Sequence, residues 1–465
     1  MPRNATNSRP TAVVIGASAA GLFAAAALAE FTDVTIVERD LLPDGPEPRR
    51  GVPQARHAHL VWSGGVQAFN DLLPGVTDDV VAQGGRLIHI MGDMVSRAPN
   101  EVWFRRFTAT HHRNLVCSRD LLDSVLRTRV RALENVTFRE NTTALGLVGD
   151  ATRVTGLHVS TGEDELTLDA DLVVDASGRG SHTPAWLERL GLPKPPEREV
   201  NAGVAYATRL YRAPGTTADR NFPLINVQAN PAKAPGQGGI ILPIEDDQWI
   251  VTLAGTRGGE PTGDLSSFEA FARNLGDPVI GRLLEHAEPL GDIATTRSTA
   301  NHRRYYEKTR RWPDGFTVLG DAIAAYNPVY GHGLTVAAQC AIAVRDILNT
   351  TSITAPGTAK LLQRAAARPV AAAWDLAVGQ DALYPGATDT PPTAVERILA
   401  RFVDQAVSTG ARNPRALSAL LDVMSLEKPA TRLFSPDMLI PMLLGPKKPH
   451  LPKAPLSEQE WKSAS

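Results

Sequence analysis

A glycine-containing turn near the N-terminus has the residue types that bind a pyrophosphate. The turn Gly-Ala-Ser-Ala-Ala-Gly begins at Gly16, follows a β-branched run and precedes an alanine-rich segment. Gly16 permits a tight turn, and Gly21 allows a helix to pack closely on a strand. The residues between them, Ser18, Ala19 and Ala20, are small enough for their backbone to approach a phosphate at the positive end of that helix. This pattern predicts a dinucleotide-binding turn.

An acidic residue after the next predicted strand narrows the choice of nucleotide. Glu38 follows the run Val34–Val37, and a carboxylate there can accept hydrogen bonds from both hydroxyls of a ribose. Its charge would repel a 2′-phosphate, so the pattern favours FAD or NAD over NADP. We expect Arg39 and Arg50 near the adenine side and the phosphates, because a planar guanidinium can donate to a pyrophosphate with two groups at once.

Two later segments favour FAD over NAD. Gly320-Asp321 follows a predicted strand, and Asn327–Leu334 (Asn-Pro-Val-Tyr-Gly-His-Gly-Leu) leads into a predicted helix. With these motifs the chain resembles FAD-dependent monooxygenases that have a glutathione-reductase-type FAD domain. The resemblance implies that Asp321 lies against the ribityl chain and that Arg119, within Cys117–Leu122, approaches the FAD phosphates. It also implies that four residues surround the isoalloxazine ring: Pro328, Gly331, Gly333 and Leu334.

A narrower resemblance rests on further segments. Residues 50–59 (Arg-Gly-Val-Pro-Gln-Ala-Arg-His-Ala-His), residues 327–333, Trp374-Asp375 and residues 381–385 are similar to the flavin epoxidases and hydroxylases of bacterial natural-product pathways. That group includes the lasalocid and monensin epoxidases, and squalene epoxidase is a more distant relative. The Trp-x-Trp-x-Ile-Pro motif of flavin-dependent tryptophan halogenases does not occur in the sequence. Residues 175–179 (Asp-Ala-Ser-Gly-Arg) replace an Asp-Gly motif of many aromatic hydroxylases. We therefore expect the electrons to come from transiently bound NAD(P)H or from a separate flavin reductase.

The resemblance implies a monooxygenase that uses O₂. Reduced flavin adds O₂ at C4a, and the distal oxygen of the resulting hydroperoxide can be attacked directly by an alkene in a dry pocket. We therefore expect an epoxidase that acts on an apolar polyene or polyketide intermediate. Hydroxylation of an aromatic or polyketide ring is the alternative, and for a phenol it requires a base. A non-catalytic protein of the same fold, such as a GDP-dissociation inhibitor, is the alternative from another class.

Few side chains are candidates for work beyond cofactor binding. His332 and Tyr330 in the predicted flavin loop could hydrogen-bond or move a proton, although His332 could equally point to solvent. Tyr206, Ile241 and Trp249 are candidates for lining the substrate pocket, with ordinary sheet packing as the alternative for each.

Histidines occur in two close pairs, which raises the question of a metal site. His57 and His59 are two residues apart, and His111 and His112 are adjacent. No cysteine or carboxylate lies near either pair at ligand spacing, so we expect no metal. The two cysteines, Cys117 and Cys340, cannot form a disulfide framework and are expected to be small buried residues of a cytoplasmic protein.

The whole chain must supply elements that bring these residues together. Its 465 residues give a soft expectation of two or three structural units. Lys and Arg number 48 against 50 Asp and Glu, for a net charge of −2, which excludes the basic field of a nucleic-acid-binding protein. The uncharged stretch 12–29 is interrupted by glycines and reads as strand, turn and helix, so no stable membrane insertion is expected.

The expected fold is α/β with an added β region. We predict a discontinuous, Rossmann-like FAD-binding domain of the glutathione-reductase type at residues 1–195 and 301–350. A β-sheet substrate domain is expected at 196–300, and a C-terminal helical region at 351–465. The expected partners are a small apolar natural-product substrate and, as one of the two possible electron donors, a flavin reductase.

Overall fold

In this computed structural model, a five-stranded parallel sheet forms the centre of one half of the molecule. The structure describes residues 9–109, 111–215, 222–297, 299–389, 393–445 and 448–464. The strand order is β19-β11-β1-β2-β7, and all four pairings are parallel. Hydrophobic β-branched runs suit strands that are covered on both faces. The strands are β1 (Thr11–Ile15), β2 (Asp33–Val37), β7 (Val136–Arg139), β11 (Leu172–Asp175) and β19 (Phe316–Val318).

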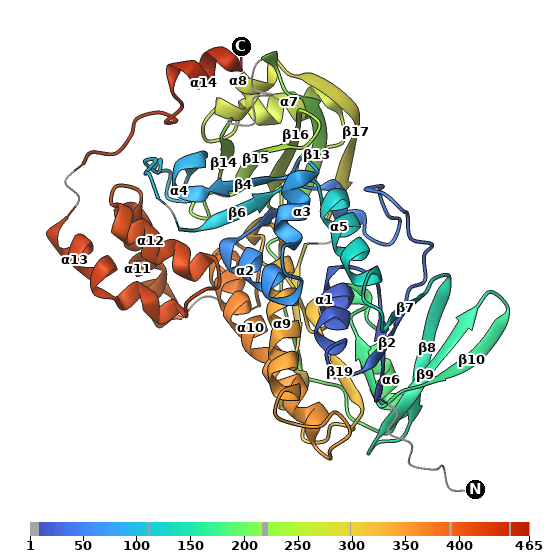
Figure 1. Cartoon of the computed structure of the whole chain (residues 1–465). Coiled ribbons are helices and arrows are strands. Elements are labelled where there is room, and N and C mark those ends of the chain that lie inside the picture. The colour runs from blue at the N-terminus through green and yellow to red at the C-terminus, as the bar shows by residue number, and fades with distance from the viewer. Residues whose placement is uncertain are drawn as a thin grey trace, which may run out of the picture.

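Long helices cover this sheet and contact one another. They are α1 (Ala19–Leu28), α5 (Arg119–Arg131), α9 (Gly333–Leu348) and α10 (Thr358–Asp381). Figure 1 shows α9 between α1 and α10, although α1 is far from the other two in the sequence. The first segment of the chain and these later segments therefore pack together.

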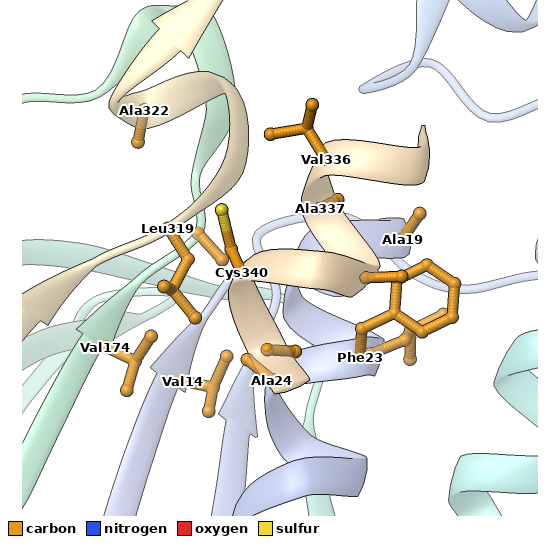
Figure 2. Packing of buried hydrophobic residues seen from close by; sticks show 14 of the residues in the cluster. Val14, Ala19, Phe23, Ala24, Val174, Leu319, Ala322, Val336, Ala337 and Cys340 are labelled. Carbon is orange, nitrogen blue, oxygen red and sulfur yellow. The ribbon is translucent and has the colours of Figure 1, made fainter. Parts of the chain in front are cut away.

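Small side chains let α1 and α9 approach closely over the ends of β1 and β11. Figure 2 shows Ala19, Phe23 and Ala24 of α1 facing Ala337 and Cys340 of α9. Cys340 is completely buried, and its thiol donates to the carbonyl oxygen of Ala366 at 3.3 Å. Both cysteines are free and buried, as the sequence predicts.

A second, six-stranded sheet has the order β17-β13-β16-β15-β14-β5 and is antiparallel except between β14 and β5. Its strands are β5 (Met94–Arg97), β13 (Ala205–Arg212), β14 (Leu224–Val227), β15 (Gln237–Ile244), β16 (Gln248–Gly255) and β17 (Glu288–Thr296). Helices α7 (Leu265–Arg273) and α8 (Val279–Leu284) pack on one face. The first segment of the predicted FAD domain thus contributes β5 to the predicted substrate domain.

Three smaller sheets and short elements complete the two halves. The sheets are β8 (Thr142–Gly149), β9 (Val154–Thr161) and β10 (Asp164–Asp169); β3 (Leu60–Val61), β4 (Arg86–His89) and β6 (Arg113–Val116); and β12 (Glu197–Val200), β18 (Asn301–Arg304) and β20 (Ala324–Ala325). Further helices are α2 (Ser63–Leu72), α3 (Val76–Ala82), α4 (Ile90–Asp93) and α6 (Thr183–Arg189). Single 3₁₀ turns are η1 (Pro53–Arg56), η2 (Gly178–Gly180), η4 (Tyr306–Lys308), η5 (Gly320–Ala322), η6 (Pro328–Tyr330) and η7 (Ala430–Phe434).

The C-terminal region is helical but does not form one unit. α10 packs in the same core as the parallel sheet, whereas α11 (Ala394–Gly410), α12 (Pro414–Met424) and α13 (Pro436–Leu444) form a separate cluster. The last helix, α14 (Glu458–Ser463), lies beside the six-stranded sheet, near α8 (Figure 1). Among the described residues, no helix is both long and apolar enough to cross a bilayer.

Candidate cofactor and substrate site

The predicted pyrophosphate turn has the expected strand–turn–helix geometry. Gly16 has a φ of +99°, which L side chains rarely adopt. A Cβ atom at Gly21 would lie 1.8 Å from the carbonyl oxygen of Gly16, so no other residue fits without a backbone shift. Ser18 precedes α1, and its side chain makes no capping hydrogen bond. The first N–H groups of α1 are therefore available to an anion.

Glu38 lies directly beside this turn, but its arginine partner is not one that the sequence predicted. Its buried Oε2 accepts from the backbone N–H of Ala17 at 2.8 Å and from Arg49 Nη2 at 2.9 Å. Arg49 also donates from Nη1 to the carbonyl oxygen of Ala17 at 2.9 Å. Arg39 and Arg50 are both exposed. Arg49, which the sequence analysis missed, is the cation that fixes Glu38.

Arg119 reaches the turn from α5. It is only 5% exposed, and Nη2 donates to Ser18 Oγ at 3.1 Å. Nε donates to Asp123 Oδ1 at 2.7 Å, which orients the guanidinium. A cation therefore faces the same turn that presents free N–H groups, and this combination favours a phosphate.

Asp321 sits on the other side of the turn. Gly320 has a φ of +62°, and a Cβ atom there would lie 2.7 Å from the Cβ of Ala20. Asp321 Oδ1 lies 3.8 Å from the place of a Cβ on Gly333, at the start of α9. Burial raises the pKa of Asp321, and the charges of Arg179 and Arg119 oppose that rise. Gly320 and Asp321 thus lie between the start of α1 and the start of α9.

The loop 327–333 follows, and the side chains in its middle are exposed to solvent. Pro328 and Val329 in η6 are exposed, whereas Leu334 in the first turn of α9 is 8% exposed. Gly331 has a φ of +67°, and Trp62 Nε1 donates to the carbonyl oxygen of Tyr330 at 2.9 Å. The side chain before α9 makes no capping bond, so this helix also begins with free N–H groups.

His332 is buried and neutral rather than exposed to solvent. Nε2 donates to the carbonyl oxygen of Met424 at 2.9 Å, and the ring is 1% exposed. Burial lowers the pKa of His332 to about 4. Nδ1 is buried and has no hydrogen-bond partner among the described residues, as is also true of Thr335 Oγ1 in the next turn. The start of α9 therefore has one buried ring nitrogen that can accept and one buried hydroxyl that can donate or accept.

The three predicted substrate residues separate onto two faces of the six-stranded sheet. Tyr206 packs with the core of the parallel-sheet half, and its hydroxyl donates to Asn327 Oδ1 at 2.6 Å. Ile241 and Trp249 are fully buried on the opposite side, where Phe222 stacks on Trp249. They are therefore packing residues and do not line a pocket facing the cofactor.

Strand periodicity identifies the residues that do share the face of Tyr206. Thr208 is two residues along β13 from Tyr206, Thr252 pairs with Thr208, and Ile240 pairs with Thr252. Ile241 and Trp249 lie an odd number of residues from Ile240 and Thr252 on the same strands, so they point to the opposite face. The sequence could not choose between the two faces, because both carry apolar residues.

His57 belongs to this face and was not predicted as a site residue. Nδ1 lies 2.8 Å from Thr208 Oγ1, and Thr208 Oγ1 lies 2.7 Å from Thr252 Oγ1. Burial, with a smaller contribution from the charge of Arg56, lowers the pKa of His57 to about 4. Burial also lowers the pKa of His59 to about 3, and its Nδ1 donates to the carbonyl oxygen of His57 at 2.8 Å. Each histidine is thus used in hydrogen bonds as a neutral ring.

The second histidine pair lies near carboxylates that the sequence spacing did not reveal. His112 is within reach of Asp422 and Glu427, with possible ligand atoms all within 4.8 Å of one another. Arg432 Nε donates to Asp422 at 2.7 Å, and the hydroxyl of Ser63 donates to Glu427. Both carboxylates therefore have partners, and the cluster ties α2 to the C-terminal helices.

Comparison with known proteins decides the family. Residues 9–378 match the model of the FAD binding domain family. The chain belongs to this family of flavin-dependent monooxygenases. Protein Rv3254 of Mycobacterium tuberculosis (strain ATCC 25618 / H37Rv) is 33% identical over 425 residues, which are 88% of each chain.

Solved structures of flavoproteins share the fold of this family member. The flavin-dependent brominase Bmp2 has a TM-score of 0.59 at 14% identity, covering 90% of this chain and 93% of its own. PqsL, a probable FAD-dependent monooxygenase from Pseudomonas aeruginosa, has a TM-score of 0.60 at 16% identity, covering 85% and 99%. The flavin-dependent halogenase CmlS has a TM-score of 0.61 at 17% identity, covering 88% and 73%.

The residues of the site fit FAD. Two helices begin with free N–H groups, one beside Arg119 and the other beside Asp321, and the glycines at 16, 21 and 320 leave no room for side chains between them. The family accounts for the cofactor, and the side chains at these two helix starts are the ones that would hold it.

Proposed function

We propose that this protein is an FAD-dependent monooxygenase that epoxidises an alkene of an apolar polyene or polyketide intermediate. The family supports flavin-dependent oxygenation. The observation that favours epoxidation is the weakness, as bases, of the three histidines near the predicted flavin loop and on the facing sheet.

Phenol hydroxylation needs a group that removes a proton from the substrate. Burial lowers the pKa of His57 and His332 to about 4 and that of His59 to about 3, so these imidazoles are poor acceptors for a phenolic proton. An alkene needs no deprotonation before it accepts an oxygen atom. These three imidazoles therefore suit an alkene better than a phenol.

The chain's own residues bind and orient. The turn at Ser18 and the guanidinium of Arg119 would hold the FAD pyrophosphate, with Glu38 at the adenosine ribose and Asp321 at the ribityl chain. Bound FAD supplies, when reduced, the activation of O₂ and the oxygen atom that is transferred.

Apolar side chains beside the loop suit an apolar substrate. Leu60 and Met94 contact two hydrophobic clusters, one against the six-stranded sheet and one against the C-terminal helices. Trp62 joins the second cluster and bonds to the flavin loop at Tyr330. These partly buried side chains would exclude water from the place where oxygen is transferred.

The proposal also covers the electron donor and the cellular location of the reaction. NAD(P)H that binds transiently, or a separate flavin reductase, would reduce the FAD in the cytoplasm. Comparing anaerobic flavin reduction by NADH and NADPH with reduction by an added reductase distinguishes these donors.

The reaction type is tested with ¹⁸O₂. The purified protein, with FAD and a reductant, is given squalene as an apolar polyene and 2-naphthol as a phenol. The proposal predicts one ¹⁸O atom in an oxirane and little ring hydroxylation. Label confined to a ring hydroxyl would favour the aromatic hydroxylase, whereas a folded protein that takes up no FAD would favour the non-catalytic alternative.

A further inference from the structure

Asp381, at the end of α10, is a buried carboxylate without a cation. It is 2% exposed, and none of the ion pairs formed by the described residues includes it. Three neutral groups donate to it instead. Tyr330 Oη donates to Oδ1 at 2.5 Å, while Asn301 Nδ2 and Asn327 Nδ2 donate to Oδ2 at 2.6 and 2.9 Å.

Backbone groups fix which way both asparagine amides face. Asn301 Oδ1 accepts from the backbone N–H of Asn327 at 2.8 Å, so Nδ2 of Asn301 must be the group that faces Asp381. Asn327 Oδ1 accepts from the backbone N–H of Val329 at 3.3 Å, so its Nδ2 also faces Asp381. All three groups can donate to an ionised carboxylate, whereas a protonated carboxyl would require the Tyr330 hydroxyl to accept instead, so these hydrogen bonds stabilise the ionised form. Burial acts in the opposite direction and raises the pKa of Asp381.

These bonds hold both ends of one short segment. Asn327 precedes η6 and Tyr330 ends it, while Pro328 and Val329 between them are exposed. The same Asn327 Oδ1 accepts from the hydroxyl of Tyr206 on β13. One carboxylate on α10 therefore bonds to both ends of the predicted flavin loop, and Asn327 connects that loop to the six-stranded sheet, which lies above α9 and α10 in Figure 1.

We propose that Asp381 is a positioning residue of the FAD site, which holds the loop 327–330 against the flavin and links it to Tyr206. This inference rests on the proposed FAD site. Asp381 does not touch the reacting atoms. Its negative charge would also oppose the extra negative charge of reduced flavin, so it would keep the reduction potential of bound FAD low.

The Asp381→Asn variant removes the charge while it preserves the shape. The new amide oxygen can accept from Asn301 and Asn327, and the new amide nitrogen can donate to Tyr330 Oη. We expect FAD to bind about tenfold more weakly, because three charge-assisted hydrogen bonds become neutral ones. We also expect the reduction potential of the remaining bound FAD to become more positive.

The Leu362→Ala variant is the matched control. Leu362 is fully buried on the same helix, so its truncation lowers stability without changing any charge. We expect its bound FAD to keep the wild-type potential. The Tyr206→Phe variant removes only the link to the sheet and should weaken FAD binding less than Asp381→Asn does.

The measurements are FAD dissociation constants by flavin fluorescence and midpoint potentials by dye equilibration. A wild-type protein that binds no FAD would refute the proposed function itself. If the wild type binds FAD but Asp381→Asn leaves both affinity and potential unchanged, the positioning role is wrong. The role is also wrong if Leu362→Ala shifts the potential as much as Asp381→Asn does. If Asp381→Asn fails to fold, Tyr330→Phe, which removes one of the three donors, must weaken FAD binding for the proposal to stand.

Discussion

Single residues around the glycine turn show how a buried ion pair supports a binding site. Glu38 accepts from a backbone N–H of the turn and from Arg49, which in turn donates to the turn's carbonyl oxygen. The carboxylate was predictable, because it ends a strand in a known relation to the glycines. The sequence did not predict that Arg49, and not Arg50, pairs with Glu38. This pairing depends on the path of a proline-rich loop that no local pattern fixes.

Truncation of Glu38 tests this arrangement. Glu38→Ala leaves the guanidinium of Arg49 buried without its partner, which should cost about 3–5 kcal/mol of unfolding free energy. The variant should also lose FAD during purification. Denaturant unfolding and the flavin absorbance of the purified protein measure the two effects. Glu47→Ala, at an exposed position of the same loop, is the control and should change neither.

The buried imidazole of His332 predicts a pH dependence of stability. Its folded pKa of about 4 lies below the ordinary value of 6.5, so folding favours the neutral ring. The stabilisation is complete above pH 6.5 and is lost as the pH falls towards 4, by about 3 kcal/mol in total. Unfolding free energies at pH 7 and pH 4 should therefore differ less in His332→Asn than in the wild type. An equal loss in both proteins would show that His332 titrates normally.

At the scale of elements, the six-stranded sheet separates the face that carries Tyr206 from the face that packs on α7 and α8. The alternation in β15 and β16 places Ile240 and Thr252 on the face of Tyr206, and Ile241 and Trp249 on the face of α7 and α8. The sequence predicted these strands and the helices that follow the glycine turns. It could not orient the sheet, because apolar residues occupy both faces of adjacent strands.

Adjacent isoleucines on β15 test this orientation. Ile241→Ala should lower the unfolding free energy by about 2–5 kcal/mol and leave the product distribution unchanged, because it opens a cavity in the far core. Ile240→Ala should change substrate selectivity with a smaller loss of stability, because Ile240 is only partly buried. Stability curves and product ratios from a mixture of polyenes give the comparison. The orientation is wrong if Ile241→Ala alters the products and Ile240→Ala does not.

At the scale of the whole molecule, the predicted domains correspond to the observed units only in part. Strand β5 joins the second sheet, α10 belongs with the parallel sheet, and α14 packs beside α8. These three elements pack outside their predicted domains because of contacts between residues far apart in the sequence. The spacing of apolar residues in one sequence does not predict such contacts. The sequence did predict the order of the cofactor motifs, because each motif lies within a short segment.

The C-terminal tail should stabilise the second sheet without affecting the cofactor. Arg106 donates to both carboxylate oxygens of Glu460 at 2.7 and 2.8 Å, and Arg282 lies over the ring of Trp461. Deletion of residues 448–465 should lower the thermal midpoint by several degrees while FAD content stays the same. Trp461→Ala should give a smaller decrease. Loss of FAD from the truncated protein would contradict the separation of tail and site.

The most direct test of the central claim is the FAD content of the purified, folded chain. We expect one tightly bound FAD per chain, with a flavin absorbance spectrum. We also expect Gly21→Val to abolish FAD binding, because the new Cβ would overlap the carbonyl oxygen of Gly16. A folded wild-type chain that remains colourless and takes up no added FAD would show that this site does not bind FAD.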